Sequence, residues 1–534
     1  MRNTKTPPAH TGTKAYLVGG GIAALASAAY LIRDGGFAGQ DIQILEEAQL
    51  LGGSLDGAGN PEDGYTIRGG RMFTYEAYTC TFDLLSLIPS LTEPGTSVKD
   101  EIYRFNELHV SNSLARLVAA KRRLDASDLG LSNQDRLDLI EIMAVPEVAL
   151  GAKRIEEVFH PSFLKTNFWF MWCTTFAFQP WHSAVELKRY LHRFIQEFPR
   201  IQTLAGVRRT PYNQFDSIVR PLVQWLGARG VRFETGARVL DLDFRYGPDG
   251  KAVETIHYLK DGAPRRIAVR DEDLVFVTNG SMTAATSLGT MTSPAKLDTG
   301  DRGGSWALWE SLAARNADFG HPEVFTRNIG ESKWLSFTLT LSDPTFFKLM
   351  EDFTGNAAGT GGLVTFIDSS WLMSVVLARQ PHFIGQPDDV QVCWGYGLFV
   401  DQEGDFVKKK MSDCSGAELL VELLGHLGFD EDKAAILASA NCIPCMMPFI
   451  TSQFMPRANG DRPPVRPVGT ANLAFIGQYC EIPDDVVFTV EYSVRSAQIA
   501  VYSLLDINRP VSPLYKGQFD PSVLLASART LVGR

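Results

Sequence analysis

Hydrophobic residues open this chain with a pattern that predicts a strand, a turn and a helix in close succession. Ala15–Val18 is a short apolar run, and Gly19-Gly20-Gly21 separates it from a longer apolar stretch, Ile22–Arg33, that stops at a pair of glycines. A short apolar run bounded by turn residues is typical of a buried strand, and glycine commonly ends a helix. A second apolar run, Ile44-Leu45, follows. The sequence therefore predicts a βαβ-type unit over residues 14–55.

The spacing of apolar residues changes along the rest of the chain. Residues 80–200 carry apolar positions three and four apart, which predicts mostly helices, and residues 216–228 and Thr489–Leu505 predict two more helices. Runs bounded by Gly, Asp, Ser and Pro predict strands, and those between residues 331 and 400 predict an antiparallel sheet that shields a ligand. The predicted strands are Val231–Phe233, Val239–Phe244, Asp273–Val277, Trp334–Leu341, Gly362–Ile367, Trp371–Leu377, Val390–Phe399 and Ala474–Gly477.

The first turn and the end of the second apolar run indicate a nucleotide ligand. A glycine turn after a strand lets the backbone approach a pyrophosphate, and the N-terminus of the next helix faces its negative charge. Gly19 and Gly21 make that turn here, and Glu46, which ends the second run, suits a ribose hydroxyl. Gly52-Gly53-Ser54 follows after five residues. Together these features favour FAD over NAD.

The length of the chain predicts more than one domain. A chain of 534 residues exceeds one ordinary hydrophobic core. The predicted fold class is α/β, with a discontinuous Rossmann-like FAD-binding domain, an α+β substrate domain and helical insertions. The FAD-binding domain is expected to comprise residues 1–80, 201–290 and 466–510. Residues 81–200 form a largely helical segment, residues 291–465 a substrate-binding domain with an antiparallel sheet, and residues 511–534 a C-terminal tail.

Composition excludes some partners. The net charge of −10 argues against nucleic acid, because phosphate binding needs a basic surface. The polar stretch Met1–Lys14 has no apolar core and does not resemble a secretory signal, and the most apolar aromatic run, Phe168–Phe178, is about half the length of a membrane span. Seven cysteines, an odd number, indicate reduced thiols and a cytoplasmic location.

One cysteine pair has the spacing of a redox motif. Cys442-Ile-Pro-Cys445 lacks the βαβ setting that such a motif needs, and no second pair completes a zinc site. The histidines show no H-E-x-x-H pattern. We interpret the cysteine spacing as coincidental and predict no metal.

A series of further motifs, in order along the chain, is specific for one family. On these motifs, which span about residues 14 to 505, the chain resembles the oleate hydratases, once called myosin-cross-reactive antigens. The resemblance implies that FAD is bound and that water is added across the cis-9 double bond of unsaturated fatty acids such as oleate, giving 10-hydroxy products. Because this hydration has no net redox change, the resemblance implies a flavin that shapes and polarises the site. The motifs are Gly52-Gly53-Ser54-Leu55-Asp56-Gly57, Arg68-Gly69-Gly70-Arg71, Asn167-Phe168-Trp169, Phe176-Ala177-Phe178, Trp181-His182-Ser183-Ala184, Tyr212-Asn213-Gln214 and residues 481–495.

The residues expected to contact FAD come from three sources. The first glycine turn and its acid supply some directly, and the family motifs supply others, including two positions near the isoalloxazine ring. A strand start where such domains usually place adenine, and the residue after the turn Thr278-Asn279-Gly280, complete the set. The expected contacts are Gly19, Gly21 and Glu46 from the turn, Gly53, Ser54, Arg68, Gly69, Gly70, Pro483 and Val487 from the motifs, and Val239 and Ser281 from the strand and turn.

The proton donor is expected on a helix that begins at Ser183. Ser183 and Glu186, three residues later, form a capping-box pattern, and Tyr190 then shares an apolar face with Leu187 and Phe194. Periodicity alone favours a core tyrosine with a satisfied hydroxyl. The resemblance instead implies a catalytic role, because the family's proton donor matches Tyr190. A phenol of pKa near 10 is a weak acid, so the site must stabilise cationic character by positioning and electrostatics.

At Met72 the sequence departs from the family. Most members read Arg-Gly-Gly-Arg-Glu-Met, and that glutamate is assigned to activate water, whereas this chain has Arg71-Met72-Phe73. A thioether cannot take a proton, and losing a general base typically costs about 10²–10⁴ in rate. Either water is held by backbone and flavin groups, or Glu76 substitutes, or the chain is weakly active. We favour the first, because water attacking a strongly cationic carbon needs little help from a base.

The carboxylate of a fatty acid needs a polar anchor at one end of a long apolar slot. Gln214 matches an anchor of the family, and Asn441 and, less clearly, Ser439 lie in the stretch that supplies the others. Cys445 appears where some relatives carry a histidine, which weakens that part of the match. When only the expected exposure is considered, a surface loop amide with no role in binding explains Asn441 as well as a substrate anchor does.

Two other functions share parts of this pattern. A flavin-dependent oxidase or desaturase of the amine-oxidase-like group has the same glycine turn, acid and glycine pair. A lipid-binding relative with weak or lost catalysis is compatible with the substitution at Met72. The expected partner is an oleate-like substrate, and a monomer and a homodimer are both open. The helical C-terminus after Pro510 is where a contact with a membrane surface is expected, although no basic amphipathic face is obvious.

Overall fold

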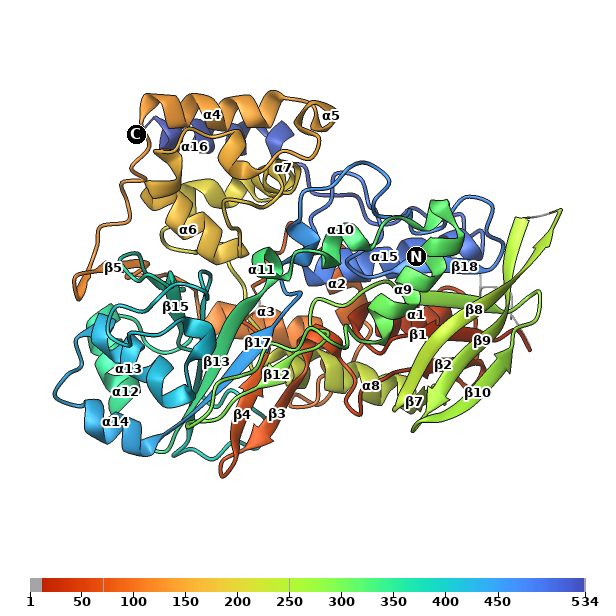
Figure 1. The fold of residues 1–534 in the computed structure, drawn as a ribbon, viewed down its shortest axis with the longest axis horizontal. Helices are drawn as coiled ribbons and strands as arrows, with labels where there is room; N and C mark the ends of the chain where they lie inside the picture. The colour runs from red at the N-terminus through yellow and green to blue at the C-terminus, as the bar shows by residue number, and fades with distance from the viewer. Residues whose placement is uncertain (1–11, 71, 249, 533–534) are drawn as a thin grey trace.

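A parallel five-stranded sheet forms the centre of the part of the molecule that contains the first glycine turn (Figure 1). The computed structural model describes residues 12–532 except residues 71 and 249. All four neighbouring pairs in this sheet are parallel. Its strands come from stretches far apart in the sequence, since the first two lie near the N-terminus and the last precedes the C-terminal helices. In spatial order they are β18 (Leu473–Ile476), β11 (Leu274–Thr278), β1 (Ala15–Val18), β2 (Ile42–Leu45) and β7 (Arg232–Glu234).

The first predicted elements are confirmed to the residue. β1 is Ala15–Val18, and helix α1 is Ile22–Arg33. Every residue of α1 from Ile22 to Leu31 is buried, because the helix lies between the sheet and α15 (Val490–Leu504). The helix predicted over residues 216–228 begins instead as a short π-helix, Phe215–Val219, and continues as α8 (Arg220–Gly227).

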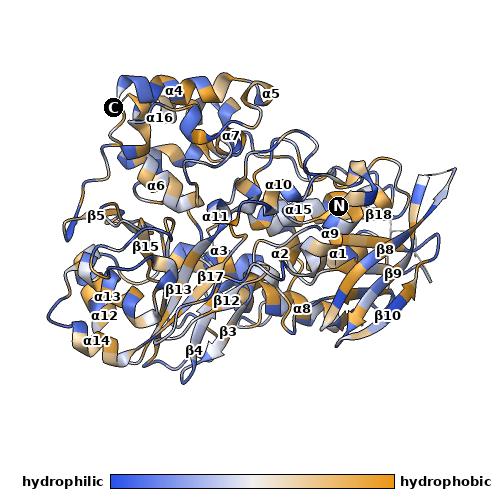
Figure 2. Ribbon diagram, viewed as in Figure 1, coloured by the Kyte–Doolittle hydropathy of each residue, from blue (hydrophilic) through white to orange (hydrophobic). Residues whose placement is uncertain are grey.

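A three-stranded antiparallel sheet follows in sequence and was only partly predicted. β8 (Ala237–Gly247) pairs with β9 (Gly250–Lys260), and β9 pairs with β10 (Ala263–Ala268). Figure 2 shows hydrophobic and hydrophilic positions mixed along these strands, as expected for a sheet with one solvent-exposed face. The predicted strand Val239–Phe244 covers only the middle of β8.

An eight-stranded sheet forms the second large body of the molecule. The sequence predicted its central strands, and Trp334–Leu341 is confirmed exactly as β13. Two strands come from the segment predicted to be largely helical, and one of them joins the sheet through a parallel pair, β14 with β5. In spatial order the strands are β12 (Ser287–Leu288), β17 (Ala440–Met447), β13 (Trp334–Leu341), β16 (Gln391–Gly397), β15 (Met373–Val376), β14 (Val364–Phe366), β5 (Leu117–Ala119) and β6 (Arg122–Arg123).

A small hairpin, β3 (Gly57–Asn60) and β4 (Gly64–Ile67), lies against this sheet. The backbone amides of Tyr65 and Ile67 donate to the hydroxyls of Thr340 and Thr338 on β13, at 2.8 and 3.2 Å. Helices surround the two large sheets. They are α2 (Thr79–Leu85), α3 (Val98–Leu108), α9 (Gly304–Arg315), α10 (Glu323–Thr326), α11 (Ile329–Ser332), α12 (Thr345–Thr354), α13 (Gly416–Leu427) and α14 (Lys433–Ser439).

A helical lobe sits above the two sheets in Figure 1. The C-terminal residues, predicted as a tail, pack into this lobe: the Ser527 hydroxyl donates to the carbonyl of Ile195, and the Arg193 guanidinium donates to that of Tyr515. The lobe comprises α4 (Asn133–Ala144), α5 (Glu147–Leu150), α6 (Asn167–Phe176), α7 (Ala184–Arg193) and α16 (Pro521–Leu531).

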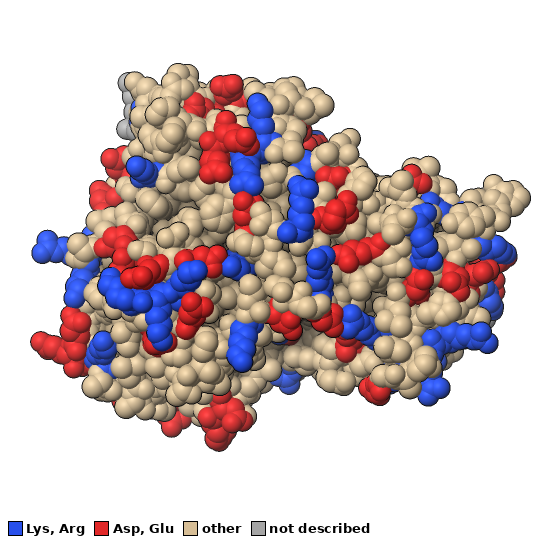
Figure 3. All heavy atoms as spheres, in the orientation of Figure 1, with Lys and Arg blue, Asp and Glu red and all other residues tan. Residues whose placement is uncertain are grey.

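The distribution of surface charge bears on the prediction about nucleic acid, and the length and hydrophobicity of the helices bear on the prediction about membranes. Figure 3 shows basic and acidic side chains intermingled over one face of the molecule, with no broad patch of one sign. Over residues 12–532, apart from 71 and 249, no helix combines the length and apolar character that a bilayer crossing requires.

Candidate active site

Two glycine turns meet at the carboxyl ends of the parallel strands. The amide of Gly52 donates to the carbonyl of Gly20 at 2.9 Å, and Gly21 bridges to Gly52. Gly19 has φ +98°, and a Cβ there would lie 2.9 Å from the hydroxyl of Thr278. The turn therefore requires glycine both for its backbone conformation and for the close approach of the neighbouring strand.

A cavity opens beside these turns, and we call it the glycine cavity. It lies at the carboxyl ends of β1, β2, β11 and β18, where open α/β sheets bind nucleotides. The first turn places its backbone amides at the N-terminus of α1, which favours negative charge. Eight predicted cofactor contacts line the cavity: Gly19, Gly21, Glu46, Gly53, Ser54, Arg68, Val239 and Ser281.

Glu46 is held in place by backbone donors. Its carboxylate accepts the amides of Gly20 and Ala48, at 2.5 and 2.7 Å. Burial raises the pKa of Glu46, partly offset by these amides. The carboxylate thus sits at the end of β2 with both oxygens oriented, as a ribose-binding acid requires.

Unpaired polar atoms beside the glycine cavity suit a polar ligand. The Thr278 hydroxyl and both amide atoms of Asn279 are buried, with no hydrogen-bond partner among the described residues. Buried polar groups rarely stay unpaired, because desolvation then goes uncompensated. Together with the glycine cradle, they fit a dinucleotide such as FAD. The open side is bounded by Glu47, which accepts from the amide of Gly304.

The glycine cavity adjoins a second, mostly apolar cavity, which we call the long cavity. Ser54 and Asp56 line both. Arg68 donates to both oxygens of Asp56, at 2.8 and 3.0 Å, and its other terminal nitrogen lies 3.6 Å from the sulfur of Cys445. This bidentate pair fixes the partition between the two cavities.

The long cavity has the character of a lipid slot. Gln214, a buried residue whose two amide atoms have no hydrogen-bond partner among the described residues, also lines this cavity. Gly69 and Gly70, predicted to contact the cofactor, line this cavity and not the glycine cavity. Its apolar walls include Leu55, Ile67, Phe105, Trp334, Leu363, Val376, Trp394 and Phe488.

Tyr190 lines a third space, the tyrosine chamber, which meets the long cavity. Gly70, Met72, Thr175 and Phe488 line both. The Tyr190 ring is 1% exposed, and its hydroxyl donates to the carbonyl of Val487 at 2.5 Å. The ring is enclosed by Phe176, Phe178, Phe194 and Phe454, with centroids 5.0 to 5.7 Å away.

The helix carrying Tyr190 starts as predicted but is capped differently. Ser183 accepts from the amide of Glu186 at 3.4 Å, so α7 begins there. The Glu186 side chain does not close a capping box; it accepts from Arg457 and Arg462, each at 3.0 Å. Burial alone would raise the pKa of Glu186, but the two guanidinium groups outweigh it and lower the pKa to about 2. Phe194 is the residue at which α7 ends, so it contacts the ring from beyond the helix.

The position of Met72 restricts what can replace the family's glutamate. Met72 is half-buried and lines both the long cavity and the tyrosine chamber. Glu76 is exposed and is not among the residues lining either space. The chamber's carboxylate is Glu197, which accepts two hydrogen bonds from Arg200 at 2.9 and 2.7 Å. Burial raises the pKa of Glu197, and Arg200 opposes that effect.

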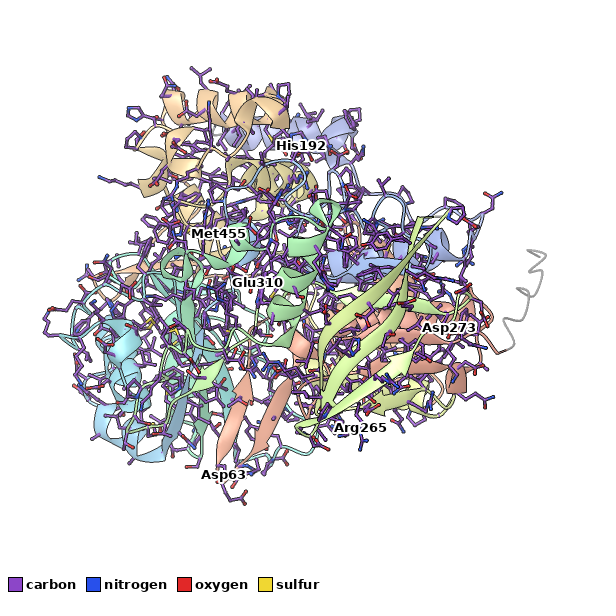
Figure 4. The ribbon with its side chains drawn as sticks, turned by 45° about the vertical axis from the view of Figure 1, so that its right-hand side comes forward. Asp63, His192, Arg265, Asp273, Glu310 and Met455 are labelled. Atoms are coloured by element: carbon purple, nitrogen blue, oxygen red, sulfur yellow. The ribbon has the colours of Figure 1, made fainter. Side chains whose placement is uncertain are left out.

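Four predicted site residues lie outside these cavities. Asn441 donates to the carbonyl of Asp63 at 2.8 Å, which ties β17 to the hairpin whose tip Figure 4 labels. Ser439 donates to the carbonyl of Ile436 at the end of α14. Pro483 is exposed, and Val487 contributes its carbonyl to Tyr190 instead of lining the glycine cavity. Arg71, part of a predicted motif, lies outside the described residues.

The cysteine pair on β17 does not form a disulfide. Cys442 and Cys445 are both buried free thiols. Residues three apart in a strand point to opposite faces, so these two sulfurs cannot act together. Cys445 faces Arg68, and Cys442 lies near Met291.

A family model places the chain among known proteins. The MCRA family model matches residues 12–502. The chain belongs to the MCRA family. It is 41% identical to an oleate hydratase of Streptococcus pyogenes serotype M49 (strain NZ131) over 522 residues, covering 96% of this chain and 88% of that protein. It is 34% identical to a linoleate hydratase of Lactiplantibacillus plantarum over 565 residues, covering 97% and 98%.

Solved structures share the fold of this MCRA family member at low sequence identity. Cyclohexylamine oxidase from Brevibacterium oxydans IH-35A superposes with a TM-score of 0.53 at 13% identity, covering 92% of this chain and 99% of that one. This likeness confirms the predicted α/β fold class with a Rossmann-like core. It carries nothing about the reaction.

Sequence reasoning missed several lining residues of this MCRA protein. Thr278 and Gly477 line the glycine cavity at the ends of two predicted strands, so the rule that parallel sheets bind ligands at carboxyl ends could have identified them. Phe488, with φ +67°, separates the long cavity from the tyrosine chamber. Arg209 and Arg379 line the long cavity, and no local sequence signal marks them.

Proposed function

We propose that this protein is an FAD-dependent hydratase that adds water to the cis-9 double bond of unsaturated fatty acids, converting oleate to 10-hydroxystearate. The observation that carries the proposal is the placement of Tyr190: a buried phenol in an aromatic chamber that meets a long apolar cavity. That cavity in turn adjoins the glycine cavity. The names of the two hydratases it resembles support an unsaturated fatty acid as substrate.

The glycine cavity would hold FAD. Gly19, Gly21 and Gly53 leave room for the pyrophosphate, and Glu46 would accept from the ribose hydroxyls. Val239 and Ser281 would line the adenine end, while Arg68 and Ser54 face the partition with the long cavity. When bound there, the flavin would supply shape and polarisation to a reaction that has no net redox change.

The Tyr190 phenol would deliver a proton to one alkene carbon. A weak acid can do this only if the developing cation is stabilised where it forms. Phe176, Phe194 and Phe488 line the chamber beside Tyr190, and aromatic rings with their faces toward the cation would stabilise it, as cation–π contacts do. Exclusion of water by the same rings would protect the cation until the attacking molecule is in place.

Water attack on the cation would proceed without a carboxylate at position 72, and the protonated alcohol that forms would return its extra proton to the Tyr190 phenolate. Backbone groups around Gly70 and Met72, where the two spaces meet, would orient the water together with the flavin. The exposed position of Glu76 argues against its acting as the substitute base.

Incubation of the FAD-loaded protein with oleate tests the proposal. We expect 10-hydroxystearate in the product extract and an unchanged flavin spectrum under anaerobic conditions. Bleaching of the flavin by substrate would support an oxidase or desaturase instead. Tight oleate binding with no product, from either flavin redox state, would support a lipid-binding relative. A cytoplasmic location and a monomer or homodimer stay predictions.

A further inference from the structure

Three carboxylates and one histidine come together outside the three cavities described above. Glu422 and His426 lie one turn apart on α13 (Figure 1), Asp405 comes from the loop after β16, and Asp368 follows β14. None of the four lines the glycine cavity, the long cavity or the tyrosine chamber. Any role of this cluster is therefore separate from the proposed reaction.

The imidazole of His426 is buried and directs its Nε2 at two carboxylates. Nε2 lies 3.4 Å from Oε1 of Glu422 and 3.4 Å from Oδ2 of Asp405, which is longer than an ordinary N–H···O hydrogen bond. The side chain is 5% exposed, and Nε2 has no hydrogen-bond partner among the described residues. The rings of Phe366 and Phe406 pack against the imidazole, with centroids 5.6 and 5.0 Å away. A buried polar atom seldom stays without a partner, so Nε2 is placed for a ligand.

The two carboxylates that face Nε2 are held by donors that leave room for a further ligand. Glu422 is fully buried and accepts three consecutive backbone amides, those of Asp405–Val407, at 2.6 to 2.9 Å. Asp405 accepts from the amide and the hydroxyl of Ser370, both at 2.8 Å. A carboxylate has about four acceptor positions, so each of these two retains some. The donors stabilise both negative charges and fix their positions.

The cluster carries more negative than positive charge. No lysine or arginine in the described part of the chain forms an ion pair with Asp368, Asp405 or Glu422. Lys408, three residues after Asp405, donates to a backbone carbonyl instead. Even a protonated His426 would offset only one of the three carboxylates. A divalent cation would compensate two charges that are otherwise costly to keep at a partly buried site.

The spacing of the facing atoms fits a tetrahedral cation. Zn²⁺ with bonds of about 2.1 Å holds tetrahedral ligands about 3.4 Å apart. Nε2 of His426 lies at that distance from both carboxylate oxygens, and all three atoms lie within 4.8 Å of one another. Residues four apart on a helix share one face, as the two histidines of helical zinc motifs do. Asp368 lies 3.7 Å from Nδ1 of His426, where metal-bound histidines commonly have a carboxylate.

We propose that His426, Glu422 and Asp405 bind one Zn²⁺ ion, and that Asp368 orients the imidazole through Nδ1. The side chains of Asp405 and Asp368 are partly exposed, so solvent supplies a water molecule as the fourth ligand. The ion ties the segments after β14 and β16 to α13 and stabilises this part of the molecule. The sequence predicted no metal because its histidines show no H-E-x-x-H pattern, and no spacing rule connects the two aspartates to the helix.

Zinc titration of the metal-stripped, FAD-loaded protein tests the site. After treatment with a chelator and desalting, calorimetric titration with Zn²⁺ should show one saturable site per chain. Saturation should raise the melting temperature, because the ion favours the folded state. Asp405→Asn and His426→Gln should each weaken zinc binding more than about 100-fold, since loss of a ligand should exceed the 10–100-fold cost typical of losing an outer partner. Retained flavin content shows that the variants are folded.

Two further variants separate the ligands from their surroundings. Asp368→Asn keeps all three ligands and should weaken binding by about 10–100-fold. Asp413→Asn, at an exposed aspartate just before α13, is the matched control and should bind zinc like wild type. Turnover is not measured, so failure of the hydratase proposal leaves this test intact. Absence of a saturable zinc site in wild type, or an affinity within tenfold of wild type in either ligand variant, would overturn the proposal and leave His426 as an ion-pair partner of the two carboxylates.

Discussion

The hydroxyl of Tyr190 donates a 2.5 Å hydrogen bond to the backbone carbonyl of Val487. This contact joins a helix of the upper lobe to the segment before α15, two parts of the chain that are 297 residues apart. The same segment is held to α7 by Arg189, which pairs with Glu481 at 2.9 Å. A backbone acceptor cannot be removed by mutation, so the phenol keeps one orientation while its ring stays inside the aromatic chamber.

Removal of the hydroxyl should separate catalysis from folding. In Tyr190→Phe the ring still fills its site among Phe176, Phe178 and Phe454, so the melting temperature should change little. Hydration should fall by at least about 10²-fold, because the proton donor is lost. The measurement is 10-hydroxystearate formation by mass spectrometry. Tyr246→Phe, at a residue 70% exposed on β8, is the control. Unchanged turnover in Tyr190→Phe would refute the acid assignment.

Restoring the family's glutamate should not simply raise activity. Met72→Glu places a carboxylate among apolar walls, where desolvation raises its pKa and its charge alters the field around the cation. We expect a rate equal to or below that of wild type, whereas Met72→Leu, of similar volume, should retain most activity. A large gain in kcat for Met72→Glu would show instead that the native protein lacks a base that it needs.

The first glycine turn should control cofactor content. Gly19→Ala places a Cβ at φ +98° and 2.9 Å from the Thr278 hydroxyl, so the turn must open or shift. A residue with a Cβ costs about 1–2 kcal/mol in such a conformation. The ratio of flavin to protein absorbance after purification should therefore drop. Gly227→Ala, where the new Cβ meets only Phe233 at 3.8 Å, should keep full flavin content.

The unpaired amide of Gln214 should affect stability and binding in opposite directions. Gln214→Leu removes two buried polar atoms that have no partner, so the free energy of unfolding should stay equal or rise by about 1 kcal/mol. The apparent KM for oleate should rise about tenfold. Chemical denaturation and steady-state kinetics on the same samples measure both. Gln40→Leu, at an exposed position, should leave KM unchanged. A destabilised protein with normal KM would contradict a substrate role.

Acid should release the ion pairs that hold α7. The folded-state pKa of Glu186 is about 2, below its ordinary value of 4.5, so its stabilising effect is complete above about pH 4.5 and is lost as pH falls toward 2. A depression of that size corresponds to about 3 kcal/mol. Glu186→Gln should be less stable at neutral pH and should lose less stability between pH 5 and 3. A pH profile parallel to that of wild type would refute this role for Glu186.

The strands and helices of this protein were predictable where the spacing of hydrophobic residues and the positions of glycine and polar turn residues indicated the same element. β1, α1 and β13 appear at their predicted residues because a buried strand or helix is apolar throughout and ends at glycine or a polar turn. β9 and β10 were missed because they lie at the surface, where half of the positions are polar. β5 was missed because its pairing with β14 joins residues nearly 250 positions apart, and β6 is a two-residue strand that pairs only with β5 among the described residues.

The features of the candidate site also fall into those that could be predicted from the sequence and those that could not. The glycine turn and Glu46 could be identified from the sequence because a nucleotide-binding motif imposes fixed backbone requirements over a short stretch. The sequence by itself thus determined the strand, glycine turn and helix of the first unit, and its family motifs single out Tyr190 as the predicted proton donor. Tertiary structure alone decided that Asn441 ties two sheets together and that Arg209 and Arg379 face one cavity. Such placements depend on contacts between distant segments, and a charge without a partner becomes visible only when all its neighbours are known.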